Sequence, residues 1–519
     1  MSPFLVSVAQ NRFMISFFRK SHKWLGIGLS LFLLLFAASG IVLNHRRLFS
    51  AAEVNRQLMP EDYHFTNWNN ASVRGSLRLS PDSILVYGNI GIWLTSSDFS
   101  EFEDFNQGFG KGIDKRKVSA VCMLPSGELY AGTYFGLFRM DRVSGQWQEV
   151  AIPVEKKRIT DLSLKGDSLL VLTRSELLIR DTAGAFHKKD FPPPRGYDNK
   201  VGLFKTLWVV HSGEIYGLVG KIIVDAIGLI FVFLTITGLV FFVNRYRIRS
   251  RKKRGKERKR LSRTNRWSLK WHNKIGWTTL ALLLLTTITG MFLRPPLLIA
   301  IASKKVIKIP GTKLDSPQAW FDQLRAIRYD EAGRRYLLAT SGGFYQADLE
   351  LRNELEGLDG QPPLSVMGIN VFEELSEGSW LVGSFSGLFI WEPDSGKVVD
   401  RISMETWKPE GRPGRPIGRN MATGLIRDYQ GGMAWFDYNR GALMLDSGAE
   451  FPAMPEKLAR SPMSLWNLAL EVHTGRIYKP VFGMFYILVV PLVGLLTLFM
   501  SVSGFIVWYK QHRRSKKRL

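Results

Sequence analysis

Cysteine is almost absent from this chain of 519 residues, since Cys122 is the only one. A single thiol allows no intrachain disulfide and no cysteine-based metal centre, and no Cys-x-x-Cys-His motif is present for covalent haem attachment. A glycine-rich dinucleotide signature is missing too. The pairs Gly26/Gly28 and Gly108/Gly110 do not follow a strand and open a helix, as that signature requires. The chain therefore has no nucleotide site of its own.

Acidic residues are scarce beside basic ones: 45 Asp and Glu against 70 Lys and Arg give a net charge of +25. Such a charge can indicate nucleic-acid binding. Here the excess is concentrated beside apolar blocks. Residues 245–274 hold about fifteen basic residues against one acidic residue, and the tail 509–519 is similarly basic. The positive-inside rule explains this placement, so no nucleic-acid partner is expected.

Four apolar blocks, each close to the length that a bilayer requires, predict four transmembrane helices. They cover residues 24–43, 222–243, 275–293 and 485–508. The basic flanks place both termini and the central loop in the cytoplasm. The sequence therefore predicts a multi-pass protein of the bacterial inner membrane, with the lipid bilayer as partner and two large insertions in the periplasm.

The expected domains follow the chain in order. They are the cytoplasmic N-terminus with the first helix (1–47), a periplasmic β insertion (48–208), the second helix (209–246), a basic cytoplasmic loop (247–270), the third helix (271–297), a second periplasmic β insertion (298–468), and the fourth helix with a basic tail (469–519).

The helices repeat in pairs. His22 starts a His-x-x-x-Gly segment that matches one at His272, and each helix carries a Ser/Thr-Gly pair. The second and fourth helices are preceded by HSGEIY from His211 and HTGRIY from His473. The unit of helix, insertion and helix is thus used twice.

The insertions also contain repeats. ELYAGTYFGLFRMD (from Glu128), SWLVGSFSGLFIWE (from Ser379) and RYLLATSGGFYQAD (from Arg335) each read as strand, turn and strand. About three such units per insertion, 40–50 residues apart, suit propeller blades. The predicted fold class is a membrane α-helical protein, a duplicated four-helix transmembrane bundle, with all-β, propeller-like insertions. One shared six-bladed ring and two half-open sheets are both compatible with this pattern.

Five of the eight histidines lie at the ends of the apolar blocks. A lone histidine there is usually an interfacial polar residue. Repeat symmetry, however, pairs His22 with His272 and His211 with His473, and two facing imidazoles suit axial ligation of haem iron. His45 has no repeat partner and is an alternative periplasmic ligand. Asp225, inside the second block, is either functional or an ion pair with Lys221.

The HxxxG…[ST]G helices and the H[ST]GxIY openings resemble the PepSY-associated transmembrane family. The resemblance implies helices around b-type haem, with His22, His272, His211 and His473 as ligands of two haems. Characterised members look like inner-membrane reductases of ferric siderophores. The insertions depart from this pattern, because they read as propeller-like rather than PepSY-like.

Two functions remain open from the sequence. The first is a haem-containing reductase that takes electrons from a cytoplasmic or quinol donor and passes them to a periplasmic acceptor such as a ferric siderophore. The alternative is a membrane-anchored periplasmic sensor or scaffold without enzymatic activity. No catalytic residue is assigned.

Overall fold

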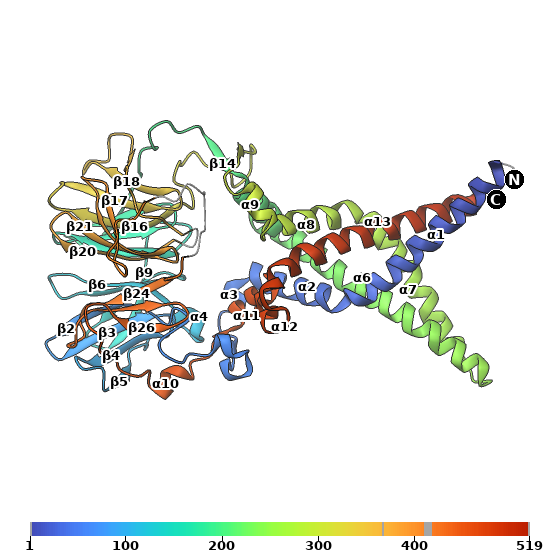
Figure 1. Cartoon of the computed structure of the whole chain (residues 1–519), viewed down its shortest axis with the longest axis horizontal. Helices are drawn as coiled ribbons and strands as arrows, with labels where there is room; N and C mark the ends of the chain where they lie inside the picture. The colour runs from blue at the N-terminus through green and yellow to red at the C-terminus, as the bar shows by residue number, and fades with distance from the viewer. Residues whose placement is uncertain (1–2, 366–367, 409–417, 517–519) are drawn as a thin grey trace. The chain divides into compact units, whose positions relative to one another are not determined.

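The computed structural model describes residues 3–365, 368–408 and 418–516. These form two compact units (Figure 1). The helical unit comprises Met1–Phe49, Asn199–Asp315 and Leu465–Leu519. The β unit comprises Ser50–Asp198 and Ser316–Ser464. Both long insertions therefore belong to one β unit, and the apolar blocks belong to the other.

The helical unit is built mainly from the apolar blocks and their flanks. Its α-helices are α1 (Pro3–Gly28), α2 (Ser30–Asn44), α3 (Arg46–Phe49), α5 (Leu203–Ser212), α6 (Gly217–Lys253), α7 (Lys259–Thr278), α8 (Leu280–Phe292), α9 (Leu297–Ile301), α11 (Leu465–His473), α12 (Lys479–Phe482) and α13 (Val489–Lys516). Within this unit α1 packs on α13, α6 on α7, and α2 on both α6 and α11. Figure 1 shows the ends of α1 and α13 side by side, so the two chain termini lie together.

The prediction of four regular transmembrane helices in a bundle is wrong. Only two helical stretches of the described chain are by themselves long and apolar enough to cross a membrane: Glu214–Lys253 and Arg476–His512. The other two blocks form bent pairs, with a bend of 57° between α1 and α2 and of 67° between α7 and α8. The chain makes up to four crossings if each bent pair counts as one.

Hydroxyl side chains bond back to the preceding turn beside both breaks. At the first break, the Ser30 hydroxyl donates to the carbonyl of Ile27. At the second, Thr278 and Thr279 donate to the carbonyls of Lys274 and Ile275. Such bonds compete with the backbone ladder and bend helices. A hydropathy pattern records apolar length, so it does not reveal these breaks.

In its described residues, the β unit contains six antiparallel sheets of three or four strands, each made of strands consecutive in sequence. The first three sheets come from the first insertion: β2 (Val73–Ser80) to β5 (Phe102–Asp104), β6 (Val118–Met123) to β9 (Gln146–Val150), and β10 (Ile159–Lys165) to β13 (Phe186–Lys189). The other three come from the second insertion: β16 (Leu324–Asp330) to β19 (Glu356–Gly357), β20 (Ile369–Ser376) to β23 (Lys397–Asp400), and β24 (Ala422–Ile426) to β26 (Gly441–Met444). Alternating apolar residues and short polar turns favour these hairpins.

The expectation of propeller-like insertions is corrected as well. The described strands form many small separate antiparallel sheets and no closed barrel or propeller, and the last sheet has three strands. What joins the sheets is side-chain packing. One core combines Leu170 and Leu172 of the first insertion with Ile327 and Leu338 of the second. A two-stranded sheet of β1 (Glu53–Val54) and β27 (Met463–Ser464) ties the ends of the unit together.

Candidate functional site

The helical unit brings four of the predicted histidines together in two pairs. His22 of α1 faces His272 of α7, with ring centres 6.1 Å apart and ring planes at 80°. His211 of α5 faces His473 of α11, with ring centres 5.9 Å apart and planes at 51°. A metal–nitrogen bond of about 2.0 Å puts an imidazole centre about 3 Å from the ion, so two axial imidazoles have centres about 6 Å apart. Both pairs have this spacing.

Every one of these imidazoles is anchored through Nδ1 to a backbone carbonyl of another helix. The four bonds are His22 to Met500 at 2.8 Å, His272 to Leu234 at 3.1 Å, His211 to Thr286 at 3.0 Å, and His473 to Phe36 at 3.0 Å. A carbonyl only accepts, so Nδ1 carries the proton and donates it. Nε2 is then left as the basic nitrogen, the form in which imidazole binds a metal.

A Ser/Thr-Gly pair three residues after each carbonyl completes a cradle for each ring. The four pairs are Ser39-Gly40 in α2, Thr237-Gly238 in α6, Thr289-Gly290 in α8 and Ser503-Gly504 in α13. The hydroxyls of Ser39, Thr237 and Thr289 lie 3.0, 3.1 and 3.3 Å from the Nδ1 atoms of His473, His272 and His211. Ser503 differs, because its hydroxyl donates to the Met500 carbonyl that His22 also uses.

The glycines in these cradles make room for the imidazoles. A Cβ added at Gly504 would lie 2.6 Å from Cε1 of His22, and one at Gly290 would lie 2.7 Å from Cε1 of His211. The same atom at Gly40 or Gly238 would lie 3.3 or 3.5 Å from its histidine. All four glycines therefore border a histidine, and two of them leave no space for any side chain.

The sequence shows that the Ser/Thr-Gly pairs recur in the repeated helices, but it does not show that they lie against the histidines. The sequence did contain one signal, because the four Ser/Thr-Gly pairs equal in number the four repeated histidines. The link was missed because each histidine is held by a different helix, up to 478 residues away in the case of His22 and Met500.

His45 lies in a different environment. Its Nε2 is 2.5 Å from Oδ2 of Asp225 in α6, and the Asn44 amide donates to the other oxygen of that carboxylate at 3.0 Å. The structure thus pairs His45 with Asp225 and not with another histidine. The carboxylate of Asp225, expected to be either functional or an ion pair with Lys221, is thus bonded to His45.

The two histidine pairs are associated with two different levels of the long helix α6. α5, which carries His211, ends shortly before α6 begins at Gly217. Gly238, further along α6, borders His272. The rise from residue 217 to residue 238 is about 32 Å of helix, close to the thickness of a bilayer core.

The donor set suits a flat macrocycle better than a bare metal ion. Among the described residues, no group of three or more His, Cys, Asp or Glu side chains is placed to hold a metal ion. Each histidine pair offers two nitrogens only. A porphyrin, which supplies four equatorial ligands itself, needs those two and no more.

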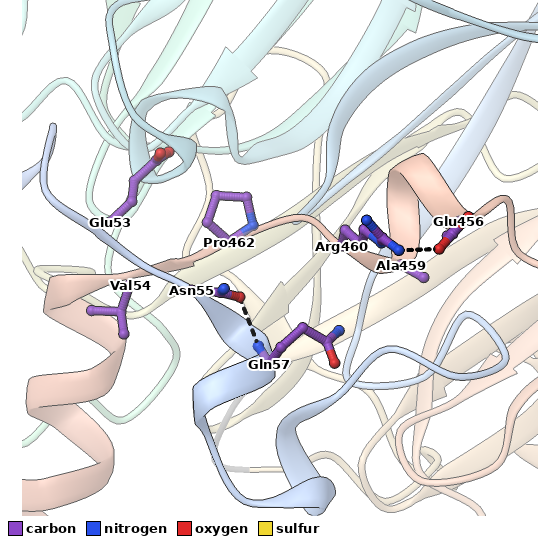
Figure 2. A pocket seen from close by; sticks show the side chains of 8 residues that line it. All are labelled: Glu53, Val54, Asn55, Gln57, Glu456, Ala459, Arg460 and Pro462. Atoms are coloured by element: carbon purple, nitrogen blue, oxygen red, sulfur yellow. Dashed lines mark hydrogen bonds and ion pairs between the residues drawn. The ribbon is translucent and has the colours of Figure 1, made fainter.

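The β unit has a pocket of about 670 Å³, a size typical of small-molecule sites. Figure 2 shows its lining. Arg460 and Glu456 pair with each other across one side, and the Asn55 side chain accepts from the backbone of Gln57. Both charged side chains are about three-quarters exposed. No histidine lines this pocket.

Together, the apolar crossings and the duplicated helices define an internally repeated membrane protein. The model of the PepSY-associated TM region matches residues 5–245 and again residues 246–511. The chain therefore belongs to the PepSY-associated transmembrane family, as the sequence motifs predicted. A search of curated proteins found no match.

Several solved structures are similar to parts of this chain, all at 10% identity. The extracellular domain of a putative hybrid two component system from B. thetaiotaomicron has a TM-score of 0.36 and is matched over 79% of this chain and 36% of its own length. A protein of unknown function from Bacteroides thetaiotaomicron has a TM-score of 0.35, with 76% and 74% covered. PorZ of Porphyromonas gingivalis, a component of the type-IX secretion system, has a TM-score of 0.33, with 72% and 38% covered. The chain spans about a third of the first of these, and at such scores the likeness carries no argument.

Proposed function

We propose that the helical unit binds two b-type haems, one between His22 and His272 and one between His211 and His473, and conducts electrons across the membrane. The observation that carries this proposal is the spacing of the two pairs, 6.1 and 5.9 Å between ring centres. The Nδ1 anchors add support, because they leave Nε2 of each ring available to an iron.

In this proposal the chain's own residues fix axial ligation, and bound haem supplies reversible one-electron chemistry. The carbonyls of Met500, Leu234, Thr286 and Phe36 hold each imidazole in one tautomer and one orientation. By accepting the Nδ1 protons, the cradles would make the imidazoles more basic and would so help to tune the potential of a bound haem.

The proposed direction of transfer is from the cytoplasm to the periplasm. The basic segments 245–274 and 509–519 indicate a cytoplasmic location by the positive-inside rule. His272 lies within the first of them, so the His22 and His272 pair is assigned to the cytoplasmic side. The donor is a cytoplasmic reductant or a quinol, and the acceptor is a ferric chelate such as a ferric siderophore, whose iron gains one electron.

Proteoliposomes test the proposed electron transfer. With reductant sealed inside and ferric citrate outside, wild-type protein should form ferrous iron outside, detected by a coloured ferrous chelator. His22→Ala removes one axial ligand and should abolish this signal. His187→Ala is the matched control, because His187 lies on an exposed strand of the β unit. Equal rates for wild type and His22→Ala would contradict the proposal.

A second candidate is a membrane-anchored sensor or scaffold without enzymatic activity. The family is described by its transmembrane region and not by a reaction, which fits this candidate better than electron transfer. The geometry of the histidine pairs is what favours the first candidate.

A further inference from the structure

A cluster of arginines lies where the two insertions pack against each other in the β unit. Arg158 immediately precedes β10, Arg174 follows β11 (Ser168–Thr173), and Arg325 is the second residue of β16. β10 packs against β16, so side chains from the first insertion meet side chains from the second. Asp322 is the acidic residue in contact with this cluster.

The carboxylate of Asp322 is already engaged. Nε of Arg174 donates to its Oδ1 at 2.6 Å, and Nη2 of the same arginine donates to the Asp322 carbonyl at 3.2 Å. Nη1 of Arg325 donates to the backbone carbonyls of Asp322 and Leu324, at 3.1 and 2.9 Å.

Arg325 also has an unsatisfied donor. Its Nε is buried and has no hydrogen-bond partner among the residues that the structure describes. More than nine in ten buried polar groups in proteins are bonded, so a buried guanidinium nitrogen without an acceptor needs an explanation. A bound ligand that supplies an acceptor atom is one explanation.

The surroundings of Arg325 are electropositive. Burial and the charges of Arg174 and Arg158 together lower the pKa of Arg325 to about 9, while the charge of Asp322 opposes this shift. Gly368, with φ +105°, packs against this side chain, because a Cβ there would lie 3.1 Å from Cδ and 3.5 Å from Nε of Arg325. The protein thus keeps a charged, partly buried arginine at a position where its charge is costly.

We propose that Arg174 and Arg325, with Arg158 beside them, form a site in the β unit for a small oxyanion ligand that bears carboxylate or phosphate groups. The planar guanidinium fork matches the two oxygens of such groups and binds them through paired hydrogen bonds. An anion here would give the buried Nε an acceptor and offset the repulsion among the arginines. The inference concerns the β unit alone and does not depend on haem.

Isothermal titration of the full-length protein in detergent tests this site. The probes are citrate and inorganic phosphate, each at constant ionic strength with chloride as the reference anion. Wild type should bind at least one of them. Arg325→Gln removes the charge and the fork, and should weaken binding at least about tenfold. Arg139→Gln is the matched control, because Arg139 is half exposed on β8 (Leu137–Asp141) and pairs with Glu128.

Arg174→Gln provides an independent variant in case Arg325→Gln impairs folding, which thermal unfolding would reveal. Citrate binding alone assigns a carboxylate ligand, phosphate binding alone assigns a phosphate ligand, and competition between the two assigns the shared chemistry. No heat with either anion, or equal weakening by Arg139→Gln, would overturn the proposal. His473→Ala should leave anion binding intact, and Arg325→Gln should leave any haem spectrum intact, so the two proposals fail separately.

Discussion

Changing His473 to Ala is expected to empty one haem site and leave the other filled. In the proposed site His473 would hold the haem together with His211, whose ring centre is 5.9 Å away, and alanine offers no replacement. Haem bound per protein should fall by about half, and the absorption of the remaining haem should stay low-spin, because His22 and His272 are untouched. The measurement is haem content by solvent extraction together with the reduced-minus-oxidised spectrum.

His45→Ala is the control for that variant. His45 is bonded to Asp225 at 2.5 Å, so its loss should leave both haems in place. If His45→Ala empties a site while His211→Ala does not, then His45 is the axial ligand and the pairing of His211 with His473 is wrong as a haem site.

Gly504→Ala and Gly290→Ala are expected to cause a loss of bound haem nearly as large as that in His473→Ala. In each case the new Cβ would sit 2.6 or 2.7 Å from an imidazole carbon, closer than any real Cβ contact, so the ring must move off its axial position. Each ring is held by its Nδ1 bond and has little freedom to yield. Haem content should fall, or the spectrum should become high-spin, at the site concerned.

Gly238→Ala is the matched control from the same type of cradle. Its Cβ would lie 3.5 Å from His272, an ordinary contact, so the spectrum should change little. Alanine also favours a helix over glycine by about 1 kcal/mol, so a loss of haem in Gly504→Ala would not come from a weakened helix. Equal spectra for all three variants would show that the cradles do not position the histidines.

The sequence predicts the membrane character of this chain well, since hydropathy and the basic flanks depend only on local composition. The family prediction is confirmed by two matches, over residues 5–245 and 246–511. The sequence does not predict that two of the four apolar segments are bent. Ser30, Thr278 and Thr279 are ordinary residues of an apolar helix by composition, but their hydroxyls bond backwards to the preceding turn beside the bends.

Contacts between distant segments are the part that the sequence does not reveal. Asp225 has Lys221 one turn away, which favours a local ion pair, yet its carboxylate is bonded to His45, 180 residues distant. The arginine cluster joins residues 158 and 174 to residue 325, from two insertions whose mutual packing no local pattern encodes. The propeller-like prediction was wrong for a related reason: repeated hairpins predict small antiparallel sheets but not how the sheets are joined.

The absorption spectrum of the purified protein tests the central claim most directly. Protein expressed with ample haem and isolated in mild detergent should show a Soret band and, after reduction, the sharp α-band of low-spin haem with two histidine ligands. The haem should be extractable with acidified solvent, because no Cys-x-x-Cys-His motif exists to hold it covalently. A colourless protein under these conditions would contradict the electron-transfer account and leave the sensor or scaffold as the better explanation.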